Sequence, residues 1–204
     1  MSKTLPPIST FYLIRHALTD LVDKALAARA PGVSLNATGR RQAECLAERL
    51  AREPIGRIYT GPLERARETA APLALRLGLE PIVSDALDEV AFGDWTGMTL
   101  EQLAPLPLWR RYNAYRGGVR APGGELLLET QVRVIAFMAR LRDEFPGQSL
   151  ALFSHGDVVK VAVAFHLGVP LDLCHRIEIL PASVSKVSIG DHGPVVHALN
   201  WTEP

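Results

Sequence analysis

The feature that most constrains the fold is an alternation of short apolar runs with segments of helical periodicity along the chain. The runs at 11–14 and 149–153 are rich in β-forming residues and apolar at almost every position. Such runs are typical of strands that are buried on both faces of a parallel sheet. The predicted strands cover residues 11–14, 57–60, 81–84 and 149–153, with a hairpin pair at 184–189 and 195–199 around a D-H-G-P turn.

Helical patterns separate these strands. Apolar residues recur at three- and four-residue spacing, which predicts helices with one buried face. Asn36 is a predicted N-cap and Gly78 a predicted stop signal, whereas Pro72 is expected to kink or restart the helix that contains it. The predicted helices lie around residues 43–50, 63–77, 128–139 and 158–165.

Strands that alternate with helices predict an α/β fold, a three-layer α/β/α sandwich. Its central sheet should be mostly parallel, with helices on both faces. We expect residues 1–204 to form one domain, because the length suits one and no linker or repeat interrupts it. Prolines and glycines punctuate residues 104–125, which we interpret as an excursion over the sheet and the active site.

Charge and cysteine content exclude several classes of partner. Lys plus Arg and Asp plus Glu both number 22, so the balance favours neither nucleic acid nor an anionic membrane. Cys45 and Cys174 are far apart and are expected to be inert core thiols in a reducing compartment. The first ten residues lack a secretory signal and no long apolar span follows, which predicts a cytoplasmic protein.

Charged side chains stand where the predicted strands end. Arg15 and His16 follow the first strand, His155 follows the strand at 149–153, and Arg65 lies in the first helical turn after residues 57–60. Ligands of open α/β sheets bind beyond the carboxyl ends of the strands. Two histidines and two arginines that converge there predict an anion site, since Arg suits phosphate and His can act as a nucleophile.

Several motifs in the same order point to one family. The most specific are L-I-R-H-A-L-T at 13–19, G-P-L-E-R-A-R-E-T-A at 61–70, L-D-E-V-A-F-G-D-W-T-G at 87–97 and F-S-H-G-D at 153–157. Secondary matches are L-N-A-T-G-R-R-Q-A at 35–43 and P-G-G-E at 122–125. Together they resemble the histidine phosphatase superfamily, in its phosphoglycerate mutase-like branch with an Arg-His-Gly-type motif. The resemblance implies a phosphoglycerate mutase-like fold.

The resemblance also implies a set of site residues. Because the sequence has no residues at metal-ligand spacing and the expected chemistry requires no cofactor, we expect neither a metal ion nor a cofactor. Two positions depart from the family pattern, because Ala17 stands where Gly is usual and Val22 where many members have an Asn that contacts phosphate. The expected catalytic residues are His16, Glu89 and His155; the expected phosphate-binding residues are Arg15, Arg65, His155 and Gly156; and the expected substrate rim comprises Thr19, Arg110, Arg111 and Tyr112.

The predicted function is hydrolysis of a small phosphorylated metabolite through a covalent phosphohistidine on His16, with Glu89 as the proton donor. One alternative is phosphoglycerate mutase-type phosphoryl transfer, and a second is a non-catalytic phospho-ligand-binding protein on the same fold. The modest excursion and short tail favour the phosphatase over the mutase, and the retained His16, Glu89 and His155 argue against the binding protein. The physiological substrate, and whether the protein is a monomer or a homodimer, stay open.

Overall fold

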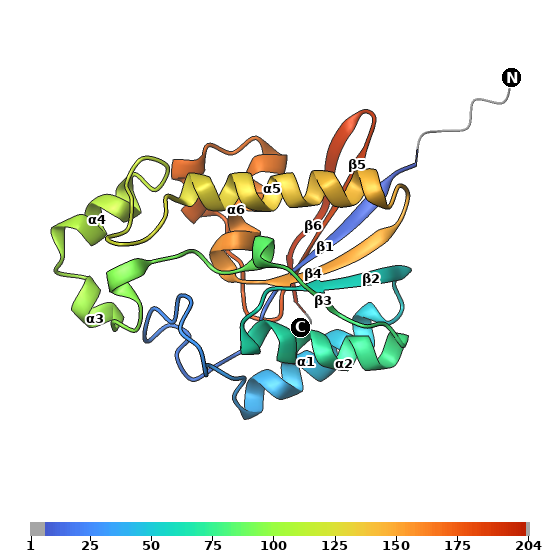
Figure 1. Cartoon of the computed structure of the whole chain (residues 1–204), viewed down its shortest axis with the longest axis horizontal. Coiled ribbons are helices and arrows are strands. Elements are labelled where there is room, and N and C mark those ends of the chain that lie inside the picture. The colour runs from blue at the N-terminus through green and yellow to red at the C-terminus, as the bar shows by residue number, and fades with distance from the viewer. Residues whose placement is uncertain (1–6, 203–204) are drawn as a thin grey trace, which may run out of the picture.

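The computed structural model describes residues 7–202 and has a six-stranded sheet in the order β3-β2-β4-β1-β5-β6 (Figure 1). Residues 1–6, part of the segment without a predicted secretory signal, lie outside the described range. The first four strands of this order pair in parallel, whereas β5 runs antiparallel to β1 and β6 antiparallel to β5. The mostly parallel sheet is confirmed. The strands are β1 (Ser9–Arg15), β2 (Ile55–Thr60), β3 (Ile82–Val83), β4 (Ser149–Ser154), β5 (Val184–Gly190) and β6 (Gly193–Trp201).

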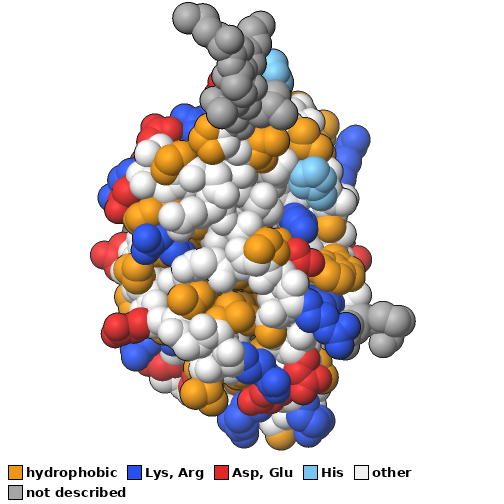
Figure 2. Space-filling model, turned by 90° about the vertical axis from the view of Figure 1, so that its right-hand side faces the viewer, with side chains coloured by type: hydrophobic (Ala, Val, Ile, Leu, Met, Phe, Trp, Pro, Cys, Tyr) orange, Lys and Arg blue, Asp and Glu red, His pale blue; other side chains and the backbone are white. Residues whose placement is uncertain are grey.

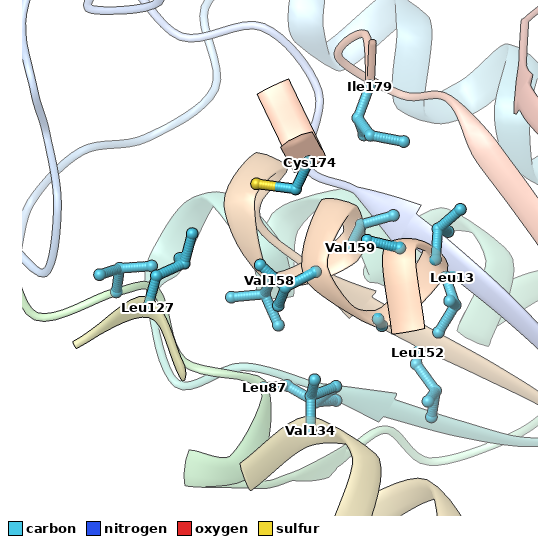
Figure 3. Packing of buried hydrophobic residues seen from close by; sticks show 14 of the residues in the cluster. Leu13, Leu87, Leu127, Val134, Leu152, Val158, Val159, Cys174 and Ile179 are labelled. Carbon is cyan, nitrogen blue, oxygen red and sulfur yellow. The ribbon is translucent and has the colours of Figure 1, made fainter. Parts of the chain in front are cut away.

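Helices cover both faces of the sheet, which confirms the three layers. Alternate residues of β1 divide between two cores: Phe11 and Leu13 belong to one, and Tyr12 and Ile14 to the other. The first core includes side chains of α5 (Leu127–Glu144) and α6 (Gly156–Leu167), some of which Figure 3 shows around Leu13. The second includes side chains of α1 (Ala37–Leu50) and α2 (Glu64–Leu77).

The predicted helix ends hold at Asn36 and Gly78, and of the two effects expected at Pro72, a kink or a restart, the restart is excluded. The Asn36 side chain accepts a hydrogen bond from the Gly39 amide at 2.8 Å and caps α1. Gly78 adopts the left-handed conformation, with φ of 63°, that ends α2. The predicted restart at Pro72 does not occur, since α2 continues from Glu64 to Leu77 and its buried face packs into one core on both sides of the proline.

The segment between β3 and α5 contains only short elements. Turns of 3-10 helix span Asp85–Leu87 and Gly93–Trp95, and two helices follow, α3 (Leu100–Leu103) and α4 (Pro107–Ala114). A third 3-10 turn, Leu171–Arg176, follows α6. In Figure 1, α3 and α4 project from one end of the sheet.

One prediction about the cysteines is wrong. Cys174 is buried, but Cys45 is exposed, because α1 turns toward the core the face that carries Ala43, Leu46 and Ala47. On the face of the molecule in Figure 2, the described side chains of both charge signs are interspersed with hydrophobic ones. In the described part of the chain, no helix is both long and apolar enough to cross a membrane.

Candidate active site

A cavity of about 230 Å³ lies beyond the carboxyl ends of β1 and β4, where the sequence predicts the anion site. Its volume is small by the standard of ligand pockets, which are typically ~300–1,000 Å³. Its lining includes the predicted site residues Arg15, His16, Thr19, Arg65, Glu89 and Gly156.

His16 follows the last residue of β1, and a hydrogen bond fixes the tautomer of its ring. Its Nδ1 lies 2.8 Å from the Ala17 carbonyl oxygen, which can only accept a hydrogen bond. The proton of the neutral ring is therefore on Nδ1, and Nε2 keeps its lone pair. Burial, together with the positive charges of Arg65 and Arg15, lowers the pKa of His16 to about 3. The ring is thus neutral at physiological pH, as a nucleophile requires.

Two buried guanidinium groups present unsatisfied donors. Arg15 donates from Nη1 to the Ile179 carbonyl at 2.7 Å, and Arg65 from Nη2 to the Ala28 carbonyl. Arg15 Nε, Arg65 Nε and Arg65 Nη1 have no partner within the described residues. Burial lowers the pKa of both groups, yet a guanidinium stays charged at neutral pH. Buried donors without partners are rare, so these N–H groups indicate an anion site.

His155 lies beside the nucleophile and precedes α6. Its ring centroid is 5.2 Å from that of His16, its side chain is fully buried, and neither ring nitrogen has a hydrogen-bond partner in the described structure. Burial and the neighbouring His16 and arginines keep the pKa of His155 well below its ordinary value. At Gly156 a Cβ would come within 3.2 Å of Arg15 Nε, so the glycine leaves room for that guanidinium.

Glu89 combines access to the cavity with a raised pKa. Its side chain is 14% exposed, one oxygen accepts from the Val90 amide at 2.9 Å, and the other lies 3.8 Å from His155 Nδ1. Burial and the negative charge of Asp157 raise the pKa of Glu89 to about 7. A carboxyl group with this pKa is about half protonated at neutral pH, so it can both give up and take a proton there.

The comparison with known proteins decides the family. The model of the histidine phosphatase superfamily (branch 1) matches residues 11–202. The chain belongs to this superfamily. The match covers the motifs on which the resemblance was based, and the predicted family is confirmed.

Relatives of this superfamily member are named for several activities. Phosphoserine phosphatase 1 of Hydrogenobacter thermophilus is 30% identical over 93% of this chain and 91% of its own length. A probable phosphoglycerate mutase of Photorhabdus laumondii is 32% identical over 90% of this chain and 86% of its own. A solved mycobacterial glucosyl-3-phosphoglycerate phosphatase complexed with VO3 has a TM-score of 0.85 and 27% identity, covering 95% and 99% of the two chains. The chain also spans 53% of a bifunctional protein of Mycobacterium tuberculosis, at 30% identity.

The loop that carries Glu89 is attached to the sheet at its beginning. The Leu87 carbonyl accepts a hydrogen bond from Ser154 Oγ, at the end of β4, at 2.7 Å. A Cβ at Gly61 would lie 2.7 Å from the same carbonyl oxygen, so only glycine allows the loop to approach the end of β2 this closely. Glu89 therefore follows a segment fixed by the ends of two strands.

Glu125, in the P-G-G-E segment, fixes the other side of this loop. Its carboxylate accepts from the Ala91 amide and from Thr130 Oγ1, each at 2.9 Å, and forms ion pairs with Arg29 at 3.0 Å and Arg133 at 2.9 Å. The same two arginines also donate to backbone carbonyls of the loop, at Glu89 and Asp88. In the sequence, Glu125 was identified only as part of a motif match. The structure shows that it supports the loop that carries Glu89.

Replacing Glu125 with Gln is expected to lower both stability and activity. The amide cannot neutralise Arg29 and Arg133, so we expect a loss of ~1.5–3 kcal/mol in the free energy of unfolding, the range for hydrogen bonds to charged groups. Urea titration measures this loss. Glu129→Gln is the matched control, because its exposed ion pair with Arg120 contributes only ~0–1 kcal/mol. Equal stability of the two variants would contradict the supporting role of Glu125.

The structure contradicts the predicted substrate rim at one residue, Tyr112. Tyr112 is fully buried and packs against Trp95 and Trp109, because α4 turns its aromatic face inward. Arg110 and Arg111 are on α4 but do not line the cavity. Thr19 does line it, although its side chain is almost fully buried.

Residues 21–28 form much of the cavity wall instead, a role that sequence analysis missed. Short backbone hydrogen bonds attach this loop to residues 97–100, including one from the Leu26 amide to the Met98 carbonyl at 2.9 Å. Val22, the departure from the family pattern, lines this wall. Ala17 is fully buried, and its amide donates to Thr69 Oγ1 at 3.0 Å, so the extra methyl group fits beside the site.

Proposed function

We propose that the protein is a phosphomonoester hydrolase that acts on a small phosphorylated metabolite through a phosphohistidine on His16. The observation that carries this proposal is the free Nε2 of His16 in a small cavity whose wall contains the unpaired N–H groups of Arg15 and Arg65. Nucleophile and anion-binding donors thus face the same space. Release of inorganic phosphate from a panel of phosphomonoesters tests it, and a protein that hydrolyses none of them would contradict it.

The first step transfers the phosphoryl group to the protein. His16 Nε2 attacks phosphorus while the bond from phosphorus to the ester oxygen breaks, and Glu89 donates a proton to the leaving oxygen. Arg15, Arg65, His155 and the amide end of α6 at Gly156 hold the phosphoryl oxygens, whose charge spreads in the transition state. The alcohol then leaves, and His16 carries the phosphoryl group.

The second step releases phosphate. Glu89, now a carboxylate, takes a proton from a water molecule whose oxygen attacks phosphorus, and the phosphorus–nitrogen bond of His16 breaks. Phosphate departs, and both side chains return to their starting protonation states. A mutase would differ only in the acceptor, which would be the hydroxyl of a second substrate. One relative is a probable phosphoglycerate mutase, so the mutase reaction stays an alternative. Measuring how much phosphate is released to water and how much is transferred to a second substrate distinguishes the two reactions.

We also propose that catalysis needs neither a metal ion nor a cofactor. Arg15 and Arg65 supply the positive charge that metal ions give to other phosphoryl-transfer sites. Within residues 7–202, no three His, Cys, Asp or Glu side chains are grouped as metal ligands would be.

We propose a cytoplasmic location as well. Reducing conditions, as in the cytoplasm, suit the exposed free thiol of Cys45.

Because the proposed catalysis needs no metal ion, activity is expected to persist unchanged in excess chelator. The measurement is the rate of phosphate release before and after prolonged incubation with EDTA and desalting, with a magnesium-dependent phosphatase treated in parallel as the control. A rate that falls and is restored by added magnesium or zinc would show that the arginines alone do not supply the charge.

A further inference from the structure

The cavity has more negative charge on its wall than an anion site needs. Three carboxylates line it, those of Asp23, Glu89 and Asp157. Asp23 is exposed to solvent, and Glu89 is the proposed proton donor. Asp157 has neither feature, because its side chain is only 17% exposed and none of the steps above uses it. A shielded negative charge beside a phosphate site opposes the binding of a dianion, so Asp157 is not explained by phosphate binding.

Asp157 lies beside a group that Glu89 contacts. It is the second residue of α6 and comes two residues after His155, whose Nδ1 is 3.8 Å from a carboxylate oxygen of Glu89. Asp157 and Glu89 also line one cavity of about 230 Å³, which is small enough for charges on its wall to interact strongly. After burial, the negative charge of Asp157 is the largest influence on the pKa of Glu89, and it raises that pKa.

Arg116, in the segment between α4 and α5, holds Asp157 in place. Its Nη1 donates to Asp157 Oδ1 at 2.9 Å and its Nη2 to Asn113 Oδ1 at 3.0 Å, and its side chain is only 11% exposed. The amide of the next residue, Gly117, donates to Asp172 Oδ1 at 2.7 Å, which attaches this segment to the 3-10 turn after α6. A partly buried carboxylate needs a partner such as Arg116 to stay charged. Arg116 itself does not line the cavity.

Cations on other elements act on Glu89 in the opposite sense to Asp157. Arg65 of α2 and Arg15 of β1 lower the pKa of Glu89, but burial and Asp157 outweigh them. Asp157 keeps its charge, because Arg116 and Lys160 lower its pKa to about 2 although burial opposes this. Other titratable or charged groups around Glu89 are Asp23, Lys160, His16, His155, Tyr112 and the paired Arg29 and Asp88.

We propose that Asp157 is a positioning residue for proton transfer: its carboxylate keeps the proton on Glu89 until the leaving oxygen accepts it, and Arg116 holds that carboxylate at the cavity wall. The inference rests on the proposed hydrolase function and deepens it. It also gives the segment at 104–125 a part in the reaction that the predicted rim did not include, because Arg116 acts on the site from this segment through Asp157.

Two variants with opposite expected shifts test this proposal. Asp157→Asn removes the negative charge, so the pH at which kcat/KM for alkyl phosphates declines should move ~1 unit lower, the size expected for the loss of one nearby charge. Arg116→Met leaves the charge of Asp157 less neutralised, so the decline should move to higher pH. A loss of packing alone would admit water, lower the pKa of Glu89 and move both profiles to lower pH. Shifts in the same direction, or no shift in Asp157→Asn, would therefore overturn the proposal.

Further variants provide the rescue and the control. Arg116→Lys keeps the positive charge and should restore a profile close to that of the wild type. Arg120→Met is the matched control, because the ion pair of Arg120 with Glu129 is exposed and neither residue lines the cavity, so its profile should not move. If a single variant does not fold, Arg116→Gln combined with Asp157→Asn removes both charges together, and its decline should again move to lower pH.

A direct titration separates this proposal from the proposed function. In protein with isotopically labelled glutamate, the NMR signal of each carboxyl carbon reports its protonation, and the Glu89 signal is the one that Glu89→Gln removes. Its midpoint should fall in Asp157→Asn and rise in Arg116→Met, whether or not the protein hydrolyses any ester. A protein that shows these shifts but has no phosphatase activity would refute only the hydrolase. An active enzyme in which the Glu89 midpoint does not move would refute only the role of Asp157.

Discussion

Replacing His16 with Ala is expected to abolish turnover, with a decrease on the order of 10⁴- to 10⁶-fold in kcat, as for other enzymes that lose a covalent nucleophile. The physical reason is that the neutral ring of His16 keeps the lone pair of Nε2 free in the cavity that the unpaired N–H groups of Arg15 and Arg65 line. Arg15 and Arg65 remain, so phosphate should still bind. Initial rates of phosphate release and calorimetry with inorganic phosphate measure the two effects.

The same variant tests the covalent intermediate. Wild-type protein mixed with labelled substrate and quenched in alkali should carry phosphate that acid removes, and the His16→Ala protein should carry none. His175→Ala is the matched control, because His175 is exposed and its ring has one hydrogen-bond partner in the described structure, the Asp172 carbonyl. Substantial turnover by a folded His16→Ala protein would rule out His16 as the nucleophile.

Replacing Glu89 with Gln is expected to slow hydrolysis of alkyl phosphates by ~10²–10⁴-fold, the usual contribution of a general acid. An alkoxide is a poor leaving group and needs the proton, whereas nitrophenolate does not. The pre-steady-state burst with para-nitrophenyl phosphate should therefore be nearly unchanged. The burst is the proper measurement because Glu89 also activates water in the second step, so its loss slows steady-state turnover with every substrate.

The pH profile provides an independent readout of the same group. A pKa of about 7 means that Glu89 is protonated below pH 7 and loses its proton above it. For alkyl phosphates, kcat/KM should accordingly fall as the pH rises through 7, and this limb should disappear in Glu89→Gln. Glu101→Gln, an exposed carboxylate in α3, should keep the wild-type profile. If Glu89→Gln slowed the para-nitrophenyl phosphate burst as much as the hydrolysis of alkyl phosphates, Glu89 would only support the loop.

Much of the fold could be predicted because its signals are local. Short apolar runs rich in β-forming residues, such as 11–14, favour buried strands. Asn36 and Gly78 fix helix ends through their own side-chain and backbone chemistry. The carboxyl ends of parallel strands also meet at one edge of the sheet, so residues that follow them lie close together. Arg15, His16 and Arg65 could therefore be assigned to one site before any distance was known, and the cavity brings them together.

The errors came from residues whose surroundings are contributed by distant segments. Tyr112 has the composition of a rim residue, but its burial depends on how α4 packs against Trp95. Cys45 has the hydrophobicity of a core residue, yet the face on which it lies is set by the pairing of α1 with α2 and the sheet. Neither result follows from residue type alone, because burial is a property of the packed surface and not of the side chain.

The sequence by itself determined the order of strands and helices, the family and the residues at the strand ends. Only the tertiary structure decided which groups surround these residues and shift their pKa values. Glu125 supports the Glu89 loop across 34 residues, and Arg116 neutralises Asp157 across 41. Such ion pairs leave no local pattern, because their partners meet only when the chain folds. The same folding desolvates Glu89 and thereby gives an ordinary carboxylate a pKa suited to proton transfer.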